Sequence, residues 1–171
     1  HGFPWFAVSI ALEVENEVTL GVVYNPSSQE LFWAEKGKGT FLNDVQIDVS
    51  RTGRLGDSLL ATGFPYDRKK SDVNNYDHFV HFQQAAQACR RPGSASLDLA
   101  YVGAGRLDGY WEMKLKPWDV AAGQLIVSEA GGRVSDFDGD PFDIYGVECL
   151  ASNGRIHQEM IDVLKAGKRP A

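Results

Sequence analysis

The segment that most constrains the fold is residues 118–132, which read WDVAAGQLIVSEAGG. Pro117 suits the first position of a helix and the Gly131-Gly132 pair suits its C-terminal end, so the segment predicts a single helix. Its run of small residues allows another element to pack closely against it. Asp119 falls in the first turn of this helix, where free N–H groups and the helix dipole favour a negative charge.

The rest of the chain predicts a meander followed by mixed structure. Short β-forming runs separated by polar or glycine-containing turns indicate antiparallel strands at residues 6–13, 18–24, 30–34 and 40–42. A further short strand is expected at residues 59–62. Later strands are expected at residues 108–113, 133–135 and 149–151, and helices at residues 74–89, 95–102 and 156–166. This alternation argues for layered α/β packing.

Composition limits the class of protein. The 171 residues can bury a core of ordinary size and fit one domain. A net charge of −6 argues against nucleic acid as a ligand, which needs a basic face, and no apolar run approaches the ~20 residues of a membrane-spanning helix. Cys89 and Cys149 match neither a disulfide framework nor a zinc spacing. We expect buried free thiols, which fits a reducing cytoplasm.

Two acidic residues are candidates for a functional site. Asp119 is either an ordinary helix-stabilising acid or a metal ligand at the mouth of a site. Glu112 lies seven residues earlier and, taken alone, could be an exposed acid on an edge strand. A strand that ends near Glu112, a short loop and a helix that begins near Trp118 would point both carboxylates into one crevice, where α/β proteins bind ligands.

A third candidate is the tripeptide Gly93-Ser94-Ala95. Ser94 is a plausible N-cap for the helix at residues 95–102. Glycine allows the backbone to approach a ligand closely, and a helix N-terminus offers free N–H groups. The tripeptide is therefore either a helix cap or part of a binding site.

Three other patterns favour structural roles. Residues 36–39 (KGKG) lack the spacing of a phosphate-binding P-loop and indicate a hairpin turn. Residues 136–140 (DFDGD) resemble part of a calcium loop without its distant glutamate, which indicates a solvated turn. His78 and His81 could form a metal pair, but a solvated helix face is the favoured interpretation.

Residues 118–132 resemble the C-terminal signature of the inositol monophosphatase family, W-D-x-A-A-G-x-L-I-V-x-E-A-G-G, nearly without a break. Three further stretches are similar to the family's G-V-V-Y-N-P, A-x-x-G-x-G-x-F and I-x-V-S stations. The resemblance implies that Asp119 is a catalytic residue that binds Mg²⁺ and lies against the substrate, and that Glu112 accepts hydrogen bonds from substrate hydroxyls. It also implies that Gly93, Ser94 and Ala95 line the substrate pocket.

The start of the chain is similar to a segment inside the family's sequence. Residues 1–12 look like the stretch directly after the D-P-x-D-G-T-x-N-F box, and neither that box nor the earlier Glu-Glu metal motif is present. We therefore expect residues 1–171 to be one domain that corresponds to the C-terminal two thirds of a family member. Residues 1–62 are expected to form part of the first sheet, and residues 63–171 the C-terminal α/β half.

The resemblance implies a function. We expect a magnesium-dependent, lithium-sensitive phosphatase that hydrolyses a small polyol phosphate monoester, with myo-inositol monophosphate as the leading substrate. Fructose-1,6-bisphosphatase, 3′-phosphonucleotide phosphatase and a truncated, non-catalytic binding or regulatory module are the alternatives. The resemblance also suggests a cytoplasmic homodimer. Because most metal ligands of the family lie in the absent motifs, we expect the isolated chain to be inactive. We also expect it to be poorly soluble, because some sheet partners of the strand at residues 6–13 should lie in the absent segment and leave an unpaired, apolar edge.

Overall fold

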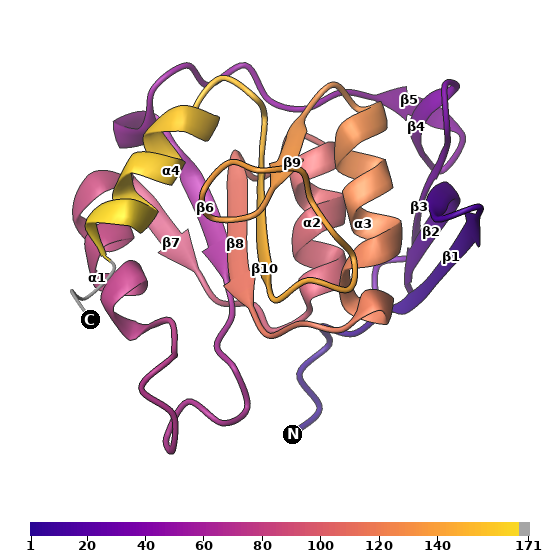
Figure 1. The fold of residues 1–171 in the computed structure, drawn as a ribbon. Helices are drawn as coiled ribbons and strands as arrows, with labels where there is room; N and C mark the ends of the chain where they lie inside the picture. The colour runs from indigo at the N-terminus through magenta and orange to yellow at the C-terminus, as the bar shows by residue number, and fades with distance from the viewer. Residues whose placement is uncertain (168–171) are drawn as a thin grey trace.

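The computed structural model describes residues 1–167, which form four layers (Figure 1). A first sheet is separated from a second sheet by helices α2 (Ala95–Gly103) and α3 (Pro117–Glu129). Helices α1 (Tyr76–Ala85) and α4 (His157–Ala166) cover the opposite side of the second sheet. The expected layered α/β sandwich is confirmed. Residues 168–171 of the expected domain lie outside the described residues.

The first sheet is an antiparallel meander, as expected. Its strands follow one another in the order of the sequence, and they are β1 (Val8–Val14), β2 (Glu17–Asn25), β3 (Glu30–Glu35), β4 (Gly39–Leu42) and β5 (Val45–Ile47). Tight turns with positive φ at Glu15-Asn16 and Asn43-Asp44 connect β1 to β2 and β4 to β5. The strand β5 was not among the expected strands.

The second sheet has the order β7-β6-β8-β10-β9 and contains both parallel and antiparallel pairs. Its strands are β6 (Leu59–Thr62), β7 (Ala88–Arg90), β8 (Gly109–Met113), β9 (Arg133–Ser135) and β10 (Glu148–Ser152), and a 3₁₀ turn, Leu55–Asp57, precedes β6. The strand β6 is therefore not part of the first sheet, and the expected boundary at residue 62 is wrong. The physical reason is pairing, because β6 bonds in parallel to β7 and β8.

A second correction concerns the helix expected at residues 74–89. It ends at Ala85, and residues 88–90 form the edge strand β7 beside β6. Cys89 is buried there against Leu55 and Leu60 in the core. Burial and parallel pairing at this position outweigh the modest helix propensity of the segment.

The small residues of α3 explain how the middle layer fits. A β-carbon on Gly21 of β2 would lie 2.7 Å from the carbonyl oxygen of Ala122, and one on Gly123 would lie 2.5 Å from Cβ of Leu99 in α2. Close packing on both sides of α3 therefore requires glycine at Gly21 and Gly123. This confirms the expectation that another element packs closely against the small side chains in segment 118–132.

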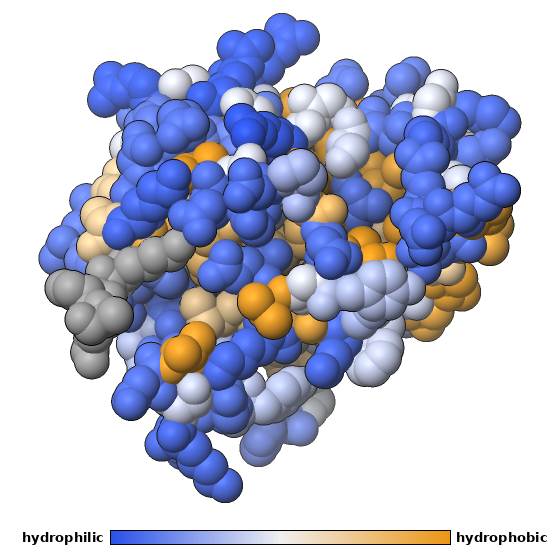
Figure 2. Space-filling model, viewed as in Figure 1, coloured by the Kyte–Doolittle hydropathy of each residue, from blue (hydrophilic) through white to orange (hydrophobic). Residues whose placement is uncertain are grey.

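The strand β1 forms an edge of the first sheet and exposes apolar side chains. Val8, Ile10, Leu12 and Val14 each leave about half of their surface open, with Ile10 59% exposed. Hydrophobic residues are visible at the right-hand edge of the molecule, on the side of the first sheet (Figure 2). Within residues 1–167, no helix has the length and apolar character needed to cross a membrane.

Candidate functional site

A cleft of about 620 Å³ lies where the N-terminal ends of α2 and α3 meet the end of β8. The segment before β1 and the loop after β6 complete its walls. The five residues expected at the site all line it, namely Gly93, Ser94, Ala95, Glu112 and Asp119. The expectation that a short loop turns Glu112 and Asp119 toward one crevice is confirmed.

Asp119 is the third residue of α3 and takes part in capping this helix. Its Oδ2 accepts a hydrogen bond of 2.9 Å from the backbone N–H of Lys116. The helix-stabilising role is therefore real, and it coexists with a position on the cleft wall. Among residues 1–167, no group of three or more histidine, cysteine or acidic side chains is arranged to hold a metal ion. Asp119 could supply one hard oxygen ligand to Mg²⁺, which accepts one or two carboxylates together with substrate phosphate.

Glu112 is largely buried in the cleft wall, and its carboxylate is enclosed. Tyr110 donates a 2.5 Å hydrogen bond from its hydroxyl to Oε2. A β-carbon on Gly63, across from it, would overlap the carboxylate. The pKa of Glu112 is raised, mainly by burial. The bond from Tyr110 lowers this pKa, the negative charge of Asp119 raises it, and the positive charge of Arg91 lowers it. Glu112 is thus a shielded acid and not an exposed one.

Asn75 fixes the wall behind Glu112 and was not found from the sequence. It is fully buried, and its Nδ2 donates to the Gly63 carbonyl oxygen and to Thr62 Oγ1, both at 2.7 Å. Its Oδ1 accepts a 2.8 Å bond from the indole N–H of Trp111. Asn75 thereby ties the end of β6 to β8 next to Glu112. No local signal marked it, because it lies at the start of an ordinary helix.

Asp98 is a second buried acid near the cleft. It is 1% exposed, and its Oδ1 has no hydrogen-bond partner among the described residues. The indole of Trp5 lies beside Asp98, and its N–H has no hydrogen-bond partner among the described residues. Burial, followed by the charge of Glu112, raises the pKa of Asp98 well above its usual range.

The tripeptide Gly93-Ser94-Ala95 departs from the expected cap. Ser94 occupies the N-cap position of α2, but its side chain does not cap the helix and lies 3.4 Å from Ser96 Oγ. Gly93 has a φ of +108°, and a β-carbon there would meet nothing within 4 Å. Glycine is needed for this backbone conformation and not for close packing. The tripeptide places the start of α2 on the cleft wall.

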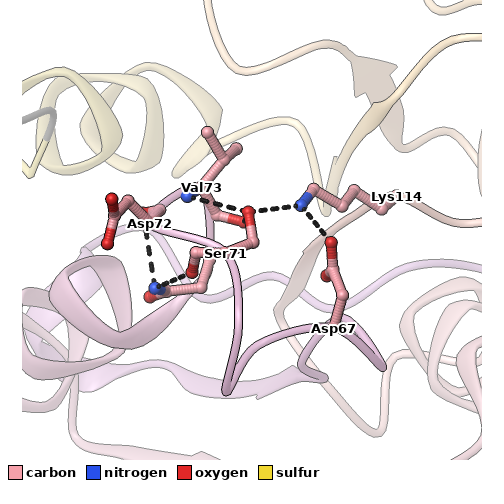
Figure 3. A network of polar contacts seen from close by, with 6 residues as sticks. Asp67, Ser71, Asp72, Val73 and Lys114 are labelled. Atoms are coloured by element: carbon pink, nitrogen blue, oxygen red, sulfur yellow. Dashed lines mark hydrogen bonds and ion pairs between the residues drawn. The ribbon is translucent and has the colours of Figure 1, made fainter.

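A basic side chain secures the loop that follows β6. Lys114, which has a φ of +60°, donates from Nζ to Asp67 Oδ2 at 2.9 Å and to Ser71 Oγ at 3.1 Å (Figure 3). Arg68 of the same loop lines the cleft, as do Arg91 and Lys114. These bonds hold the loop beside the cleft, and the positive charge of Arg91 acts on Glu112.

The patterns expected to be structural lie away from the cleft. Residues 36–38 form the β3–β4 turn, and the backbone N–H groups of Gly37 and of Gly39, the first residue of β4, donate to the carboxylate of Glu129 at 2.9 and 3.0 Å. In residues 136–140, Oδ1 of Asp136 accepts two backbone N–H groups of its own loop. Both segments are turns, as expected, but the second is not wholly solvated, because Phe137 is fully buried in the core.

The histidine and cysteine expectations have different outcomes. His78 is buried, with its ring edge-on to Phe137 at 5.5 Å between centroids, so the expected solvated helix face is wrong for this residue. The helix packs there against the C-terminal part of the chain, which the local sequence does not show. Cys89 and Cys149 are free and buried, as expected, and burial raises the pKa of both thiols.

Comparison with known proteins places these features in context. Residues 1–168 match the model of the inositol monophosphatase family. The chain is 51% identical to inositol-1-monophosphatase of Synechocystis over 166 residues, which cover 97% of this chain and 58% of the relative. It is 44% identical to the Nus factor SuhB of Escherichia coli over 160 residues, which cover 92% of this chain and 59% of the relative.

A solved structure agrees with this relationship. The inositol monophosphatase from Anabaena superposes with a TM-score of 0.93 at 45% identity, over 95% of this chain and 65% of that protein. The chain thus spans less than two thirds of these relatives. By the family match and by these identities, the chain belongs to the inositol monophosphatase family.

Proposed function

We propose that the whole protein is a magnesium-dependent phosphatase that hydrolyses a small polyol phosphate monoester, with myo-inositol monophosphate as the leading substrate. The observation that carries the proposal is one cleft on which Glu112, Asp119 and the N-terminal ends of α2 and α3 converge. Helix N-termini attract phosphate through free N–H groups and the helix dipole. Carboxylates at the same place suit a divalent cation and hydroxyl groups.

Asp119 is the proposed catalytic metal ligand. When bound, Mg²⁺ neutralises charge on the phosphoryl oxygens and activates a water molecule. Asp119 contributes a carboxylate oxygen to it from the first turn of α3, where the bond from Lys116 N–H fixes the side-chain rotamer. The described residues lack a group of three or more possible ligands, so further ligands must come from outside them.

Glu112 and the tripeptide Gly93-Ser94-Ala95 are the proposed binding residues for the polyol. A buried carboxylate with a free lone pair accepts bonds from substrate hydroxyls, and each such bond contributes roughly 1.5–3 kcal/mol. Gly93, Ser94 and Ala95 line the same cleft, and Ser94 carries a hydroxyl. The chain has a net charge of −6, but the basic residues Arg68 and Arg91 line the cleft and favour an anionic substrate there.

The test measures phosphate release by the whole protein. We expect turnover of myo-inositol monophosphate that requires Mg²⁺, is inhibited by Li⁺, and exceeds turnover of fructose 1,6-bisphosphate or of a 3′-phosphonucleotide. Asp119→Asn should abolish magnesium-dependent turnover, whereas Asp57→Asn, at an exposed aspartate away from the cleft, should not. Near-normal activity of Asp119→Asn would refute the assignment.

Glu112→Gln tests the proposed recognition of the polyol. The variant should weaken binding of the polyol substrate far more than binding of p-nitrophenyl phosphate, a phosphate ester that lacks the polyol hydroxyls. Equal losses on the two substrates would contradict the role of Glu112.

A second candidate function is a binding or regulatory role. Some relatives are named Nus factor SuhB, a name that refers to a factor and not to a phosphatase. A whole protein that binds Mg²⁺ but turns over none of these substrates would favour this role.

We also propose that the whole protein is a cytoplasmic homodimer. The free, buried thiols of Cys89 and Cys149 support a reducing compartment. Light scattering of the purified protein tests the dimer. Fractionation of the cells that produce the protein tests its location.

A further inference from the structure

The hydrogen bond between Tyr110 and Glu112 lies in the wall of the cleft. The two residues are two positions apart on β8 and therefore face the same side of the sheet. Tyr110 is fully buried among Leu99, Val102 and Val120. Its hydroxyl donates a hydrogen bond of 2.5 Å to Oε2 of Glu112. Packing holds the ring in place, so the hydroxyl defines where that oxygen lies.

Gly63 limits the carboxylate from the other side. A β-carbon there would overlap both carboxylate oxygens of Glu112, so the backbone of Gly63 passes directly against the group. The bond from Asn75 Nδ2 to the Gly63 carbonyl oxygen, 2.7 Å long, prevents this backbone from moving away. The carboxylate is thus enclosed between a fixed hydroxyl and a fixed backbone.

From this geometry we infer that Tyr110 is a positioning residue for substrate recognition, which acts by holding Oε2 of Glu112 and leaving Oε1 as the acceptor for a substrate hydroxyl. The inference rests on the proposed function, because it takes Glu112 to bind the polyol. Burial, together with the charge of Glu112, raises the pKa of Tyr110 well above its usual range. The hydroxyl therefore stays a donor over the whole working pH range.

Kinetics of Tyr110→Phe in the whole protein test the inference. The variant keeps the ring and removes the donor. We expect KM for myo-inositol monophosphate to rise about tenfold, the effect of losing one hydrogen bond to a charged group, with kcat and the turnover of p-nitrophenyl phosphate unchanged. Tyr101→Phe is the matched control, because Tyr101 donates to Glu30 at 3.0 Å outside the cleft. Equal losses on both substrates would overturn the inference.

A double-mutant cycle shows whether Tyr110 acts through Glu112. In a Glu112→Gln background, Tyr110→Phe should raise the polyol KM by less than twofold. A further tenfold rise would mean that Tyr110 acts by another route, and the inference would fail.

A readout without turnover separates this inference from the proposed function. In protein carrying ¹³C-labelled glutamate, the Glu112 carboxyl resonance is identified by its loss in Glu112→Gln. Tyr110→Phe should shift this resonance and Tyr101→Phe should not. An unchanged resonance overturns the positioning role even if the protein is a phosphatase. A shifted resonance supports that role even if myo-inositol monophosphate is not hydrolysed.

Discussion

Mild acid should destabilise this protein through His157, which the fold holds in its neutral form. Its Nδ1 lies 2.8 Å from Ser152 Oγ and its Nε2 lies 2.9 Å from Ser135 Oγ. Ser135 donates its own proton to the carbonyl oxygen of Asp136 at 2.6 Å, so Nε2 must carry the imidazole proton. Ser152 Oγ accepts the N–H of Gly154 and donates to Nδ1. A second ring proton would break this arrangement.

The size of the effect follows from the pKa of His157. Burial, and secondarily the charge of Arg133, lowers that pKa from 6.5 to about 4. Between these values the unfolded chain binds a proton that the folded chain refuses, so the stabilisation is complete above pH 6.5 and is lost as the pH falls toward 4. Linkage gives a loss of about 2 kcal/mol between pH 7 and pH 5, a large part of the stability of an ordinary domain.

Urea unfolding at pH 7, 6 and 5 measures this loss. Asp98 and Glu112, whose pKa values are raised, contribute with the opposite sign, so the wild type must be compared with His157→Gln. Glutamine keeps a polar side chain at this place and cannot be protonated in this range. We expect the wild type to lose about 2 kcal/mol more than the variant between pH 7 and pH 5. Parallel pH profiles would refute the reasoning.

Three further predictions concern packing and solubility. Gly63→Ala should displace the Glu112 carboxylate and lower the free energy of unfolding by about 1–3 kcal/mol. It should also raise KM for the polyol more than KM for p-nitrophenyl phosphate. An unchanged KM would contradict the enclosed geometry. Glu129→Gln should cost about 1–2 kcal/mol in urea unfolding, because each turn N–H bonds a different carboxylate oxygen and the amide nitrogen that replaces one of these oxygens cannot accept. Glu159→Gln is a control on another helix, at a glutamate that accepts one backbone N–H through a single oxygen. Equal stability of wild type and Glu129→Gln would contradict the anchor. Residues 1–171 expressed alone should aggregate and lack magnesium-dependent phosphatase activity. Ile10→Lys, which places a charge on the exposed edge strand, should raise the soluble fraction measured by light scattering. A soluble, active wild-type polypeptide would contradict the prediction.

Much of the fold was predictable because its signals are local. Pro117 and the Gly131-Gly132 pair mark the ends of α3 within a few residues, and the turns of the first sheet coincide with polar and glycine-containing stretches. Glu112 and Asp119 could be predicted to converge because only a short loop separates the strand of one from the helix of the other. In these cases the sequence neighbours are also the spatial neighbours.

The errors occur where the deciding partner lies far along the chain. The strand β6 pairs with β7 and β8, residues 88–90 become a strand because β6 is beside them, and His78 is buried by a distant loop. No property of those segments alone carries this information. Strand pairing and burial contribute more free energy than local propensity does, so the tertiary partner decides the secondary structure of these segments.

The sequence by itself determined the order and type of most elements, the family resemblance and the pair of carboxylates that meet at the cleft. Only the tertiary structure decided how Glu112 is held, whereas Asp119 is held by a local bond from the Lys116 N–H. The hydroxyl of Tyr110, the backbone of Gly63 and the amide of Asn75 enclose Glu112, and they come from three different elements. Positions and residue types can be read from a linear pattern, but burial and hydrogen-bond partners exist only once distant segments pack together.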